Sequence, residues 1–344
     1  MGNRQVGPGQ PCFIIAEAGV NHNGDFERAR KLVDAATASG ADAVKFQTFK
    51  AEKLVTATAR KADYQVRNTG SDESLFDMLK KLELSESDHE KLLSHCRDRG
   101  ILFLSTPFDE DSADFLLRLG VAAFKVSSGD LTNTPFLKRL ASMKLPIILS
   151  TGMATMDEVR EAVEAVRAGG EPPLLLLQCV SNYPAEAVNT NLRAMMAMAA
   201  ETGYATGYSD HTLGDEVAIA SVALGACVLE KHMTLDTRLP GPDHAASMMP
   251  DDFSRMVERI RRVECALGSG IKVPSEAEKQ TRAAARKSVT MAVDCRKGEP
   301  VVESVVCFKR PGIGIPPSRL ESIIGRRFAH DMKAGETVTT DCLE

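Results

Sequence analysis

Residues 207–234 read GYSDHTLGDEVAIASVALGACVLEKHMT, and this stretch contains the pattern that decides the fold. Two short apolar runs end in His211 and His232, and a helix-like segment with one apolar side, 215–224, separates them. If the two runs are parallel strands of one sheet, the segment between them is the crossover helix. Both imidazoles then emerge at the same edge of the sheet.

Two neutral imidazoles at that edge could hold a divalent metal with open coordination positions. Glu230 and Asp210 lie beside them in the sequence. The alternative is that each histidine only satisfies a turn, because two ligands fall short of the usual three.

The rest of the chain repeats this alternation of strand and helix. We expect strands at 13–16, 41–49, 101–105, 122–128, 146–150 and 174–180, and helices at 26–39, 86–99, 111–119, 134–143, from 155 onward, 192–201 and 251–267. Eight units with nearly continuous apolar strands are typical of a buried parallel sheet. Their size and number predict an α/β fold, the (β/α)8 TIM barrel. An open doubly wound sheet is the alternative, but no G-x-G-x-x-G follows the first strand.

The character of the chain changes after the barrel. Residues 1–267 form the predicted TIM-barrel domain, 268–282 are polar and helix-prone and indicate a linker, and 283–344 are rich in short strands and turn-forming residues. We expect this last part to be a small β-rich module. Within the barrel, 52–84 is a long insertion, and loops of that size usually carry function or short helices of their own.

The composition excludes several classes of protein. The net charge of −5 gives no electrostatic footprint for nucleic acid. The eight cysteines form no C-x-x-C pair, which indicates reduced thiols. No apolar run approaches the length that spans a membrane, and the first residues lack a signal-peptide core. We therefore expect a cytoplasmic protein that binds neither membranes nor nucleic acid.

Polar side chains end every predicted strand. In a barrel, residues at the carboxyl ends of the strands are the catalytic candidates. In strand order they are Glu17; Lys45 and Gln47; Ser105 and Thr106; Lys125, Ser127 and Ser128; Ser150 and Thr151; Gln178, Ser181, Asn182 and Tyr183; Ser209, Asp210 and His211; Glu230 and His232.

Lys45 and Lys125 stand out because each lies inside an apolar strand. A buried ammonium must be desolvated unless it faces an anion or a carboxylate. One interpretation is a pair of Lys–Glu ion pairs in the barrel mouth. The other is a pocket for a carboxylate and a phosphate, lined by the two lysines and several hydroxyls. Glu17 is correspondingly either a structural counter-ion or a general base.

These motifs resemble the sialic acid synthase family, which condenses phosphoenolpyruvate with an N-acylated hexosamine. The resemblance covers nearly the whole chain in the right order, and its C-terminal part resembles the antifreeze-like (SAF) domain of those enzymes. The matching stretches are IAEAGVNHNGD (15–25), AVKFQTF (43–49), STPFD (105–109), FKVSSGDLTN (124–133), ILSTGM (148–153), NYPA (182–185), GYSDHTLG (207–214), LEKHMTLD (229–236), GPDHAASM (241–248) and KRPGIGI (309–315).

The resemblance implies a TIM barrel, a SAF domain, a domain-swapped homodimer and a divalent metal, manganese with magnesium or cobalt as alternatives. His211 and His232 would be the metal ligands and, with Glu17 and Glu230, the catalytic residues. Phosphoenolpyruvate would be held by Lys45, Lys125, Ser128, Ser150 and Ser209. Tyr183 and Asp243 would bind the sugar, together with Arg310 contributed by the partner subunit.

The implied reaction is a metal-assisted C–C bond formation followed by C–O cleavage, giving N-acetylneuraminate or N,N'-diacetyllegionaminate and phosphate. The sugar would be N-acetylmannosamine or 2,4-diacetamido-2,4,6-trideoxymannose. The run from Cys179 to Tyr183 departs from the family's usual Thr-Asn-x-Tyr, so the sugar stays open. The alternatives are a pseudaminate synthase, a metal-dependent barrel aldolase or hydrolase, and a non-catalytic carbohydrate- or ice-binding protein.

Overall fold

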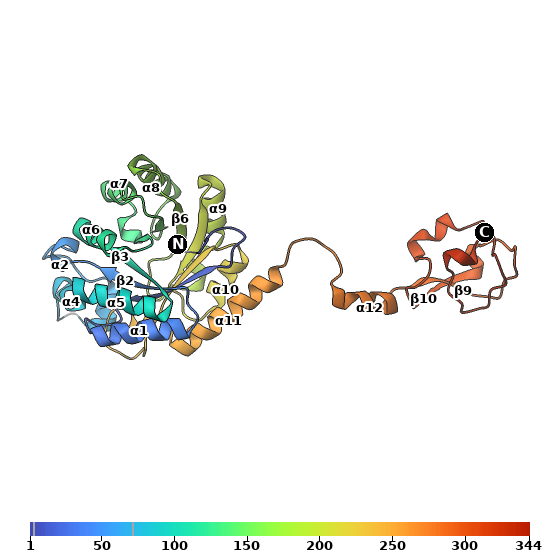
Figure 1. The fold of residues 1–344 in the computed structure, drawn as a ribbon, viewed down its shortest axis with the longest axis horizontal. Coiled ribbons are helices and arrows are strands. Elements are labelled where there is room, and N and C mark those ends of the chain that lie inside the picture. Colours follow the sequence, from blue (N-terminus) through green and yellow to red (C-terminus); the bar gives the residue numbers. More distant parts are fainter. Residues whose placement is uncertain (3, 71) are drawn as a thin grey trace. The chain divides into compact units, whose positions relative to one another are not determined.

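The computed structural model describes residues 1–2, 4–70 and 72–344. The chain divides into two compact units, Met1–Gly268 and Ser269–Glu344 (Figure 1). Each unit has a hydrophobic core of its own, and each is therefore described by itself.

Eight parallel strands close into a barrel in the first unit, which confirms the predicted fold (Figure 1). Neighbouring strands pair in sequence order, and β1 closes the barrel against β8. The strands are β1 Phe13–Gly19, β2 Ala43–Thr48, β3 Leu102–Pro107, β4 Phe124–Val126, β5 Ile147–Ser150, β6 Leu174–Cys179, β7 Ala205–Asp210 and β8 Val228–His232. β4 is shorter than expected, since the 3₁₀ turn Ser128–Asp130 begins two residues after its end.

Helices cover the outside of the barrel, as the alternating pattern predicts. They are α1 Phe26–Ala38, α5 Glu86–Arg99, α6 Glu110–Leu119, α7 Thr134–Ser142, α8 Met156–Gly169, α9 Arg193–Thr202, α10 Glu216–Ala223 and α11 Pro250–Leu267. Local chemistry sets their ends. Ser85 caps α5 by accepting from the backbone N–H of Asp88, and Gly100 ends it in the left-handed conformation. Thr155 and Glu158 form a capping box on α8.

The alternation of side chains along β8 decides which residues can reach the barrel interior. Val228 packs in the cluster that fills the lower barrel, whereas Leu229 belongs to the layer between barrel and helices. Glu230 and His232 therefore share the inward face with Val228. Lys231 points outward, with Leu229.

The insertion between β2 and α5 folds into three short helices, α2 Ala51–Leu54, α3 Asp63–Thr69 and α4 Leu75–Leu82. A small apolar cluster of Val20, Phe49, Met78 and Leu82 holds α4 on the rim of the barrel. No residue of α3 is buried. The insertion thus adds a second layer above the carboxyl ends of the first strands.

The second unit contains a two-stranded antiparallel sheet, β9 Ser288–Met291 and β10 Val306–Lys309. Its core includes Val289, Met291 and Phe328. The predicted linker is partly ordered as helix α12, Glu276–Ala285, which Ser275 and Glu278 cap at its start. In the part of the chain that the structure describes, no helix has both the length and the apolar character needed to cross a membrane.

Candidate active site

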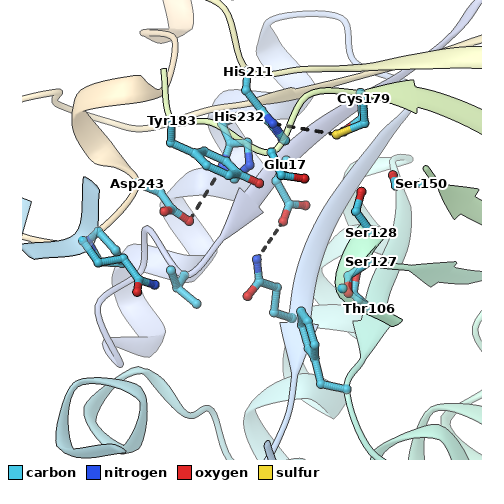
Figure 2. Close-up of a pocket in the computed structure, with 18 of the residues that line it drawn as sticks. Glu17, Thr106, Ser127, Ser128, Ser150, Cys179, Tyr183, His211, His232 and Asp243 are labelled. Atoms are coloured by element: carbon cyan, nitrogen blue, oxygen red, sulfur yellow. Dashed lines mark hydrogen bonds and ion pairs between the residues drawn. The ribbon is translucent and has the colours of Figure 1, made fainter. Parts of the chain in front are cut away.

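A cavity of about 410 Å³ opens at the carboxyl ends of the barrel strands (Figure 2). Every residue of the first unit to which the family resemblance assigns a role lines it: Glu17, Lys45, Lys125, Ser128, Ser150, Tyr183, Ser209, His211, Glu230, His232 and Asp243. Of the other candidates at the strand ends, Gln47, Thr106, Ser127 and Ser181 also line the cavity, whereas Ser105, Thr151, Gln178, Asn182 and Asp210 are not among its lining residues. The remaining predicted site residue, Arg310, is exposed and follows β10 in the second unit. The volume is within the usual range for a small-molecule site.

Buried lysines and carboxylates occupy the floor of this cavity. Lys45 Nζ lies 2.7 Å from Glu17 Oε2 and 3.8 Å from Glu230 Oε1. Lys45 also donates to Thr106 Oγ1 at 3.0 Å. Lys125 Nζ lies 3.6 Å from Glu230 Oε1. Both lysines therefore have carboxylate partners, yet both also face the cavity, so the two sequence interpretations describe the same cluster.

The charges of this cluster favour the binding of a further anion. Burial lowers the pKa of Lys125, although Glu230 opposes this shift. Burial also raises the pKa of Glu17 to about 7, with Lys45 opposing the shift and Glu230 adding to it. The buried Lys125 ammonium is thus incompletely compensated, and a carboxylate or phosphate beside it would favour its charged form.

Hydroxyl groups from neighbouring strand ends extend the cationic floor. The backbone N–H of Gly152 donates to Ser128 Oγ at 2.9 Å. Ser150 Oγ is buried and has no hydrogen-bond partner among the described residues. A side chain at Gly152 would place its Cβ 2.4 Å from Ser181 Oγ and 2.8 Å from Ser128 Oγ. Glycine therefore lets the hydroxyl groups of Ser128 and Ser181 approach this point of the cavity, which Lys125 and Ser150 also line, an arrangement suited to anionic oxygens.

His211 and His232 lie next to each other, as the strand pattern predicts, with ring centroids 5.4 Å apart. The carbonyl oxygen of Val180 lies 2.6 Å from His211 Nδ1. Because a carbonyl only accepts, His211 donates through Nδ1, and the neutral form of the ring has a free lone pair on Nε2. Burial and the neighbouring cations lower the pKa of His232, so that ring is neutral. Figure 2 shows both rings beside Tyr183 and Glu17.

Two adjacent imidazoles, one of them oriented by a carbonyl, in their unprotonated forms fit a metal ion that leaves positions for water or substrate. His232 Nδ1 is buried and has no hydrogen-bond partner in the described part of the chain, and the nearest carboxylate oxygen is Asp243 Oδ2 at 4.0 Å. The described residues contain no group of three or more His, Cys, Asp or Glu arranged to hold a metal. The two histidines are thus the candidate ligands, whereas Asp210, which the sequence placed beside them, accepts from Lys231 Nζ at 2.7 Å instead.

Tyr183 and Asp243 form the side of the cavity next to the histidines. The Tyr183 ring centroid lies 4.0 Å from that of His211. Burial raises the pKa of Asp243 to about 6, and a protonated His211 would oppose this shift. Tyr64 of α3 stacks on Tyr183, with ring centroids 4.9 Å apart. The insertion thus reaches the same side of the cavity.

Sequence reasoning missed Tyr64 and Gly152, which shape this site, and Lys231, which lies behind it on the outer face of β8. Lys231 is a lysine inside an apolar strand, the signal that singled out Lys45 and Lys125, and it could have been found in the same way. Tyr64 and Gly152 carried no such signal, because their roles depend on segments that meet only in the folded chain.

The profile of the NeuB family matches residues 32–272, and that of the SAF domain matches residues 286–344. The family match covers most of the chain and includes the strands that supply the lysines, the serines and both histidines. The chain belongs to the NeuB family. Its second unit corresponds to the SAF domain, as the sequence motifs predict.

Among NeuB-family relatives, the N,N'-diacetyllegionaminic acid synthase of Legionella pneumophila is 48% identical, over 100% of this chain and 98% of that protein. The N,N'-diacetyllegionaminic acid synthase of Campylobacter jejuni is 44% identical, over 95% and 98%. The pseudaminic acid synthase of the same bacterium is 34% identical, over 95% of both proteins. The crystal structure of N-acetylneuraminic acid synthetase from Leptospira borgpetersenii matches with a TM-score of 0.72 and 32% identity, covering 82% of this chain and 93% of that one.

Proposed function

We propose that this protein condenses phosphoenolpyruvate with 2,4-diacetamido-2,4,6-trideoxymannose to give N,N'-diacetyllegionaminate and phosphate. The observation that carries the proposal is the buried lysine and serine cluster directly beside the histidine pair. It combines a place for a small dianion with a place for a metal and a second substrate. The higher identity to the two legionaminic acid synthases than to the pseudaminic acid synthase favours this sugar.

Lys45 and Lys125 bind the carboxylate and phosphate of phosphoenolpyruvate in this proposal, with hydrogen bonds from Ser128, Ser150 and Ser209. Releasing Glu17 and Glu230 from the lysines is compensated by the charge of the bound anion. Holding the enol phosphate in one orientation next to the sugar converts a bimolecular reaction into an effectively unimolecular one. Such placement alone can lower a barrier by about 7–11 kcal/mol.

His211 and His232 would hold a divalent ion, manganese in our proposal, that supplies a Lewis acid for the aldehyde oxygen of the open-chain sugar. The methylene carbon of phosphoenolpyruvate forms the new bond to the aldehyde carbon. Water then adds to the cationic C2 carbon, and Glu17 accepts the proton. A carboxylate with a pKa of about 7 suits this role near neutral pH. The tetrahedral intermediate loses phosphate by C–O cleavage.

Tyr183 and Asp243 would contact the sugar, and Arg310 of the partner subunit would complete the site in a domain-swapped homodimer. A guanidinium donates well to the carbonyl of an N-acyl group. The exposed position of Arg310 beside β10 leaves it free to make such a contact.

The test is a phosphate-release assay with phosphoenolpyruvate and three purified sugars: 2,4-diacetamido-2,4,6-trideoxymannose, N-acetylmannosamine and the stereoisomer that would give pseudaminate. We expect the highest kcat/KM with the first sugar, and a product mass equal to both substrates plus water minus phosphate. Phosphate release with none of the three would refute the proposal. A higher kcat/KM with another sugar would correct the substrate.

A further inference from the structure

One side of the active-site cavity is apolar, and the insertion builds it. Six side chains from α2, the residue after it, and α4 face the cavity, and we call them the apolar wall: Leu54, Val55, Leu75, Met78, Leu79 and Leu82. The lysines, serines and histidines come from the barrel strands instead. A substrate that bridges both sides therefore places a charged end on the strands and a less polar end against the wall.

Tyr64 connects this wall to the polar side of the cavity. Its ring stacks on Tyr183, and the two planes are 27° apart. Asn68, on the same helix, donates through Nδ2 to the carbonyl oxygen of Pro242 at 2.6 Å. No residue of α3 is fully buried, and these contacts, with that of Thr69 Oγ1 to Met78 Sδ at 3.7 Å, help to hold the helix over the cavity.

The electrostatics also place Tyr64 at the sugar side. Partial burial and then the nearby charge of Asp243 raise the pKa of the Tyr64 hydroxyl, so this phenol stays neutral. Asp243 and Tyr183 are the residues to which we assign sugar contacts. A neutral aromatic ring between them and the apolar wall provides a surface for nonpolar groups.

We propose that Tyr64 is a specificity-determining residue that, with the apolar wall, selects a sugar whose far end carries methyl groups. This inference rests on the proposed function. The 6-deoxy carbon and the 4-acetamido group of 2,4-diacetamido-2,4,6-trideoxymannose each present a methyl group. N-acetylmannosamine presents hydroxyls at both positions, and a hydroxyl against an apolar surface loses its hydrogen bonds to water.

The test compares the ratio of kcat/KM for the two sugars in wild type and variants. We expect Tyr64→Ala to lower the preference for the diacetamido sugar about 10-fold, within the range for lost apolar contacts in a pocket. The KM for phosphoenolpyruvate should not change. Tyr64→Phe keeps the ring and should keep the preference. Arg67→Ala, on an exposed position of the same helix, is the matched control and should also keep it.

A second variant, Leu79→Asn, puts a polar group into the wall without touching Tyr64, and we expect it to lower the same ratio. If circular dichroism shows that Tyr64→Ala has not folded, the result with Leu79→Asn decides the question. An equal decrease in kcat/KM with both sugars would mean that Tyr64 only supports the fold. This outcome would overturn the inference and leave the proposed function standing. A wild-type protein that turns over neither sugar would overturn the proposed function and this inference together.

Discussion

Lys231 Nζ donates to Asp210 Oδ2 at 2.7 Å, and both side chains are buried outside the barrel lumen. Lys231 also donates to the carbonyl oxygen of Thr212 at 2.8 Å, and Asp210 Oδ1 accepts from the backbone N–H of Thr212 at 2.9 Å. Asp210 and Lys231 directly precede His211 and His232. The pair therefore joins the ends of β7 and β8, and we expect it to hold the two imidazoles at their spacing.

Replacing Lys231 by Met should destabilise the barrel by about 3–5 kcal/mol, because it leaves the Asp210 carboxylate buried without its cation. The loss of this support should also weaken metal binding about 10–100-fold, as expected when a group that orients metal ligands is removed. Denaturant unfolding measures the first effect, and titration calorimetry with Mn²⁺ measures the second.

A matched control is the exposed pair Lys333–Asp294 in the second unit, whose Nζ–Oδ2 distance is 3.0 Å. Lys333→Met should cost less than about 1 kcal/mol, because solvent screens the charges of an exposed pair. Unchanged stability and Mn²⁺ affinity in Lys231→Met would show that the Lys231–Asp210 pair does not hold the histidines in place.

His211→Ala should abolish high-affinity Mn²⁺ binding while leaving the fold intact, since His211 is one of the two imidazoles of the proposed metal site. We expect the affinity to fall by more than about 100-fold, beyond the effect of losing an orienting group. Calorimetry measures binding, and circular dichroism checks the fold. His330→Ala removes an exposed histidine of the second unit and serves as the control. Wild-type affinity in His211→Ala would remove this residue from the metal site.

The barrel could be predicted from sequence because its strands are buried on both faces and therefore appear as nearly continuous apolar runs. Lys45 and Lys125 could be singled out for the same reason, because they are charged residues within these apolar runs. Lys–Glu pairs, with Glu17 as a possible counter-ion, were one of the two interpretations of the sequence. Which lysine Glu17 contacts could not be predicted, because pairing depends on strand register: Glu17 lies opposite Lys45 only once β1 and β2 are aligned.

The insertion was less predictable for a different reason. Its helices are short and depend on tertiary contacts such as the packing of Met78 and Leu82 on Val20. The stack of Tyr64 on Tyr183 joins segments far apart in the chain, and a single aromatic residue in a polar stretch gives no hint of its partner. The Arg310 assignment came from the family resemblance and stays a prediction.

His22 should make the barrel less stable in mild acid. Gly24 donates its backbone N–H to His22 Nδ1 at 3.0 Å, so the folded state requires an unprotonated Nδ1. Burial lowers the pKa of His22 to about 3, whereas an unfolded histidine titrates near 6.5. The unfolded chain thus binds the proton more readily. The contribution of unprotonated His22 to the free energy of unfolding is complete above about pH 6.5. It is lost as the pH falls toward 3, and about 2 kcal/mol of it is lost at pH 5.

Denaturant unfolding of wild type and His22→Asn at pH 7 and pH 5 measures this effect. Asparagine can still accept from Gly24 but carries no titrating group. The decrease in the free energy of unfolding from pH 7 to pH 5 should therefore be smaller by about 2 kcal/mol in this variant. His330→Asn changes an exposed histidine and should leave the decrease in the free energy of unfolding between the two pH values unchanged. An equal pH dependence in His22→Asn and wild type would show that His22 is not responsible.

Arg310→Ala should raise the KM for the sugar more than the KM for phosphoenolpyruvate, whereas Arg319→Ala, at another exposed arginine of the second unit, should change neither. Co-expression with His211→Ala tests whether Arg310 acts across subunits. In a swapped dimer, a mixed dimer contains one site with both His211 and the partner's Arg310 intact. Random pairing would then restore about a quarter of wild-type activity, since half of the dimers are mixed and each has one intact site. If Arg310 acted within its own chain, every site would lack one of the two residues and mixing would restore nothing.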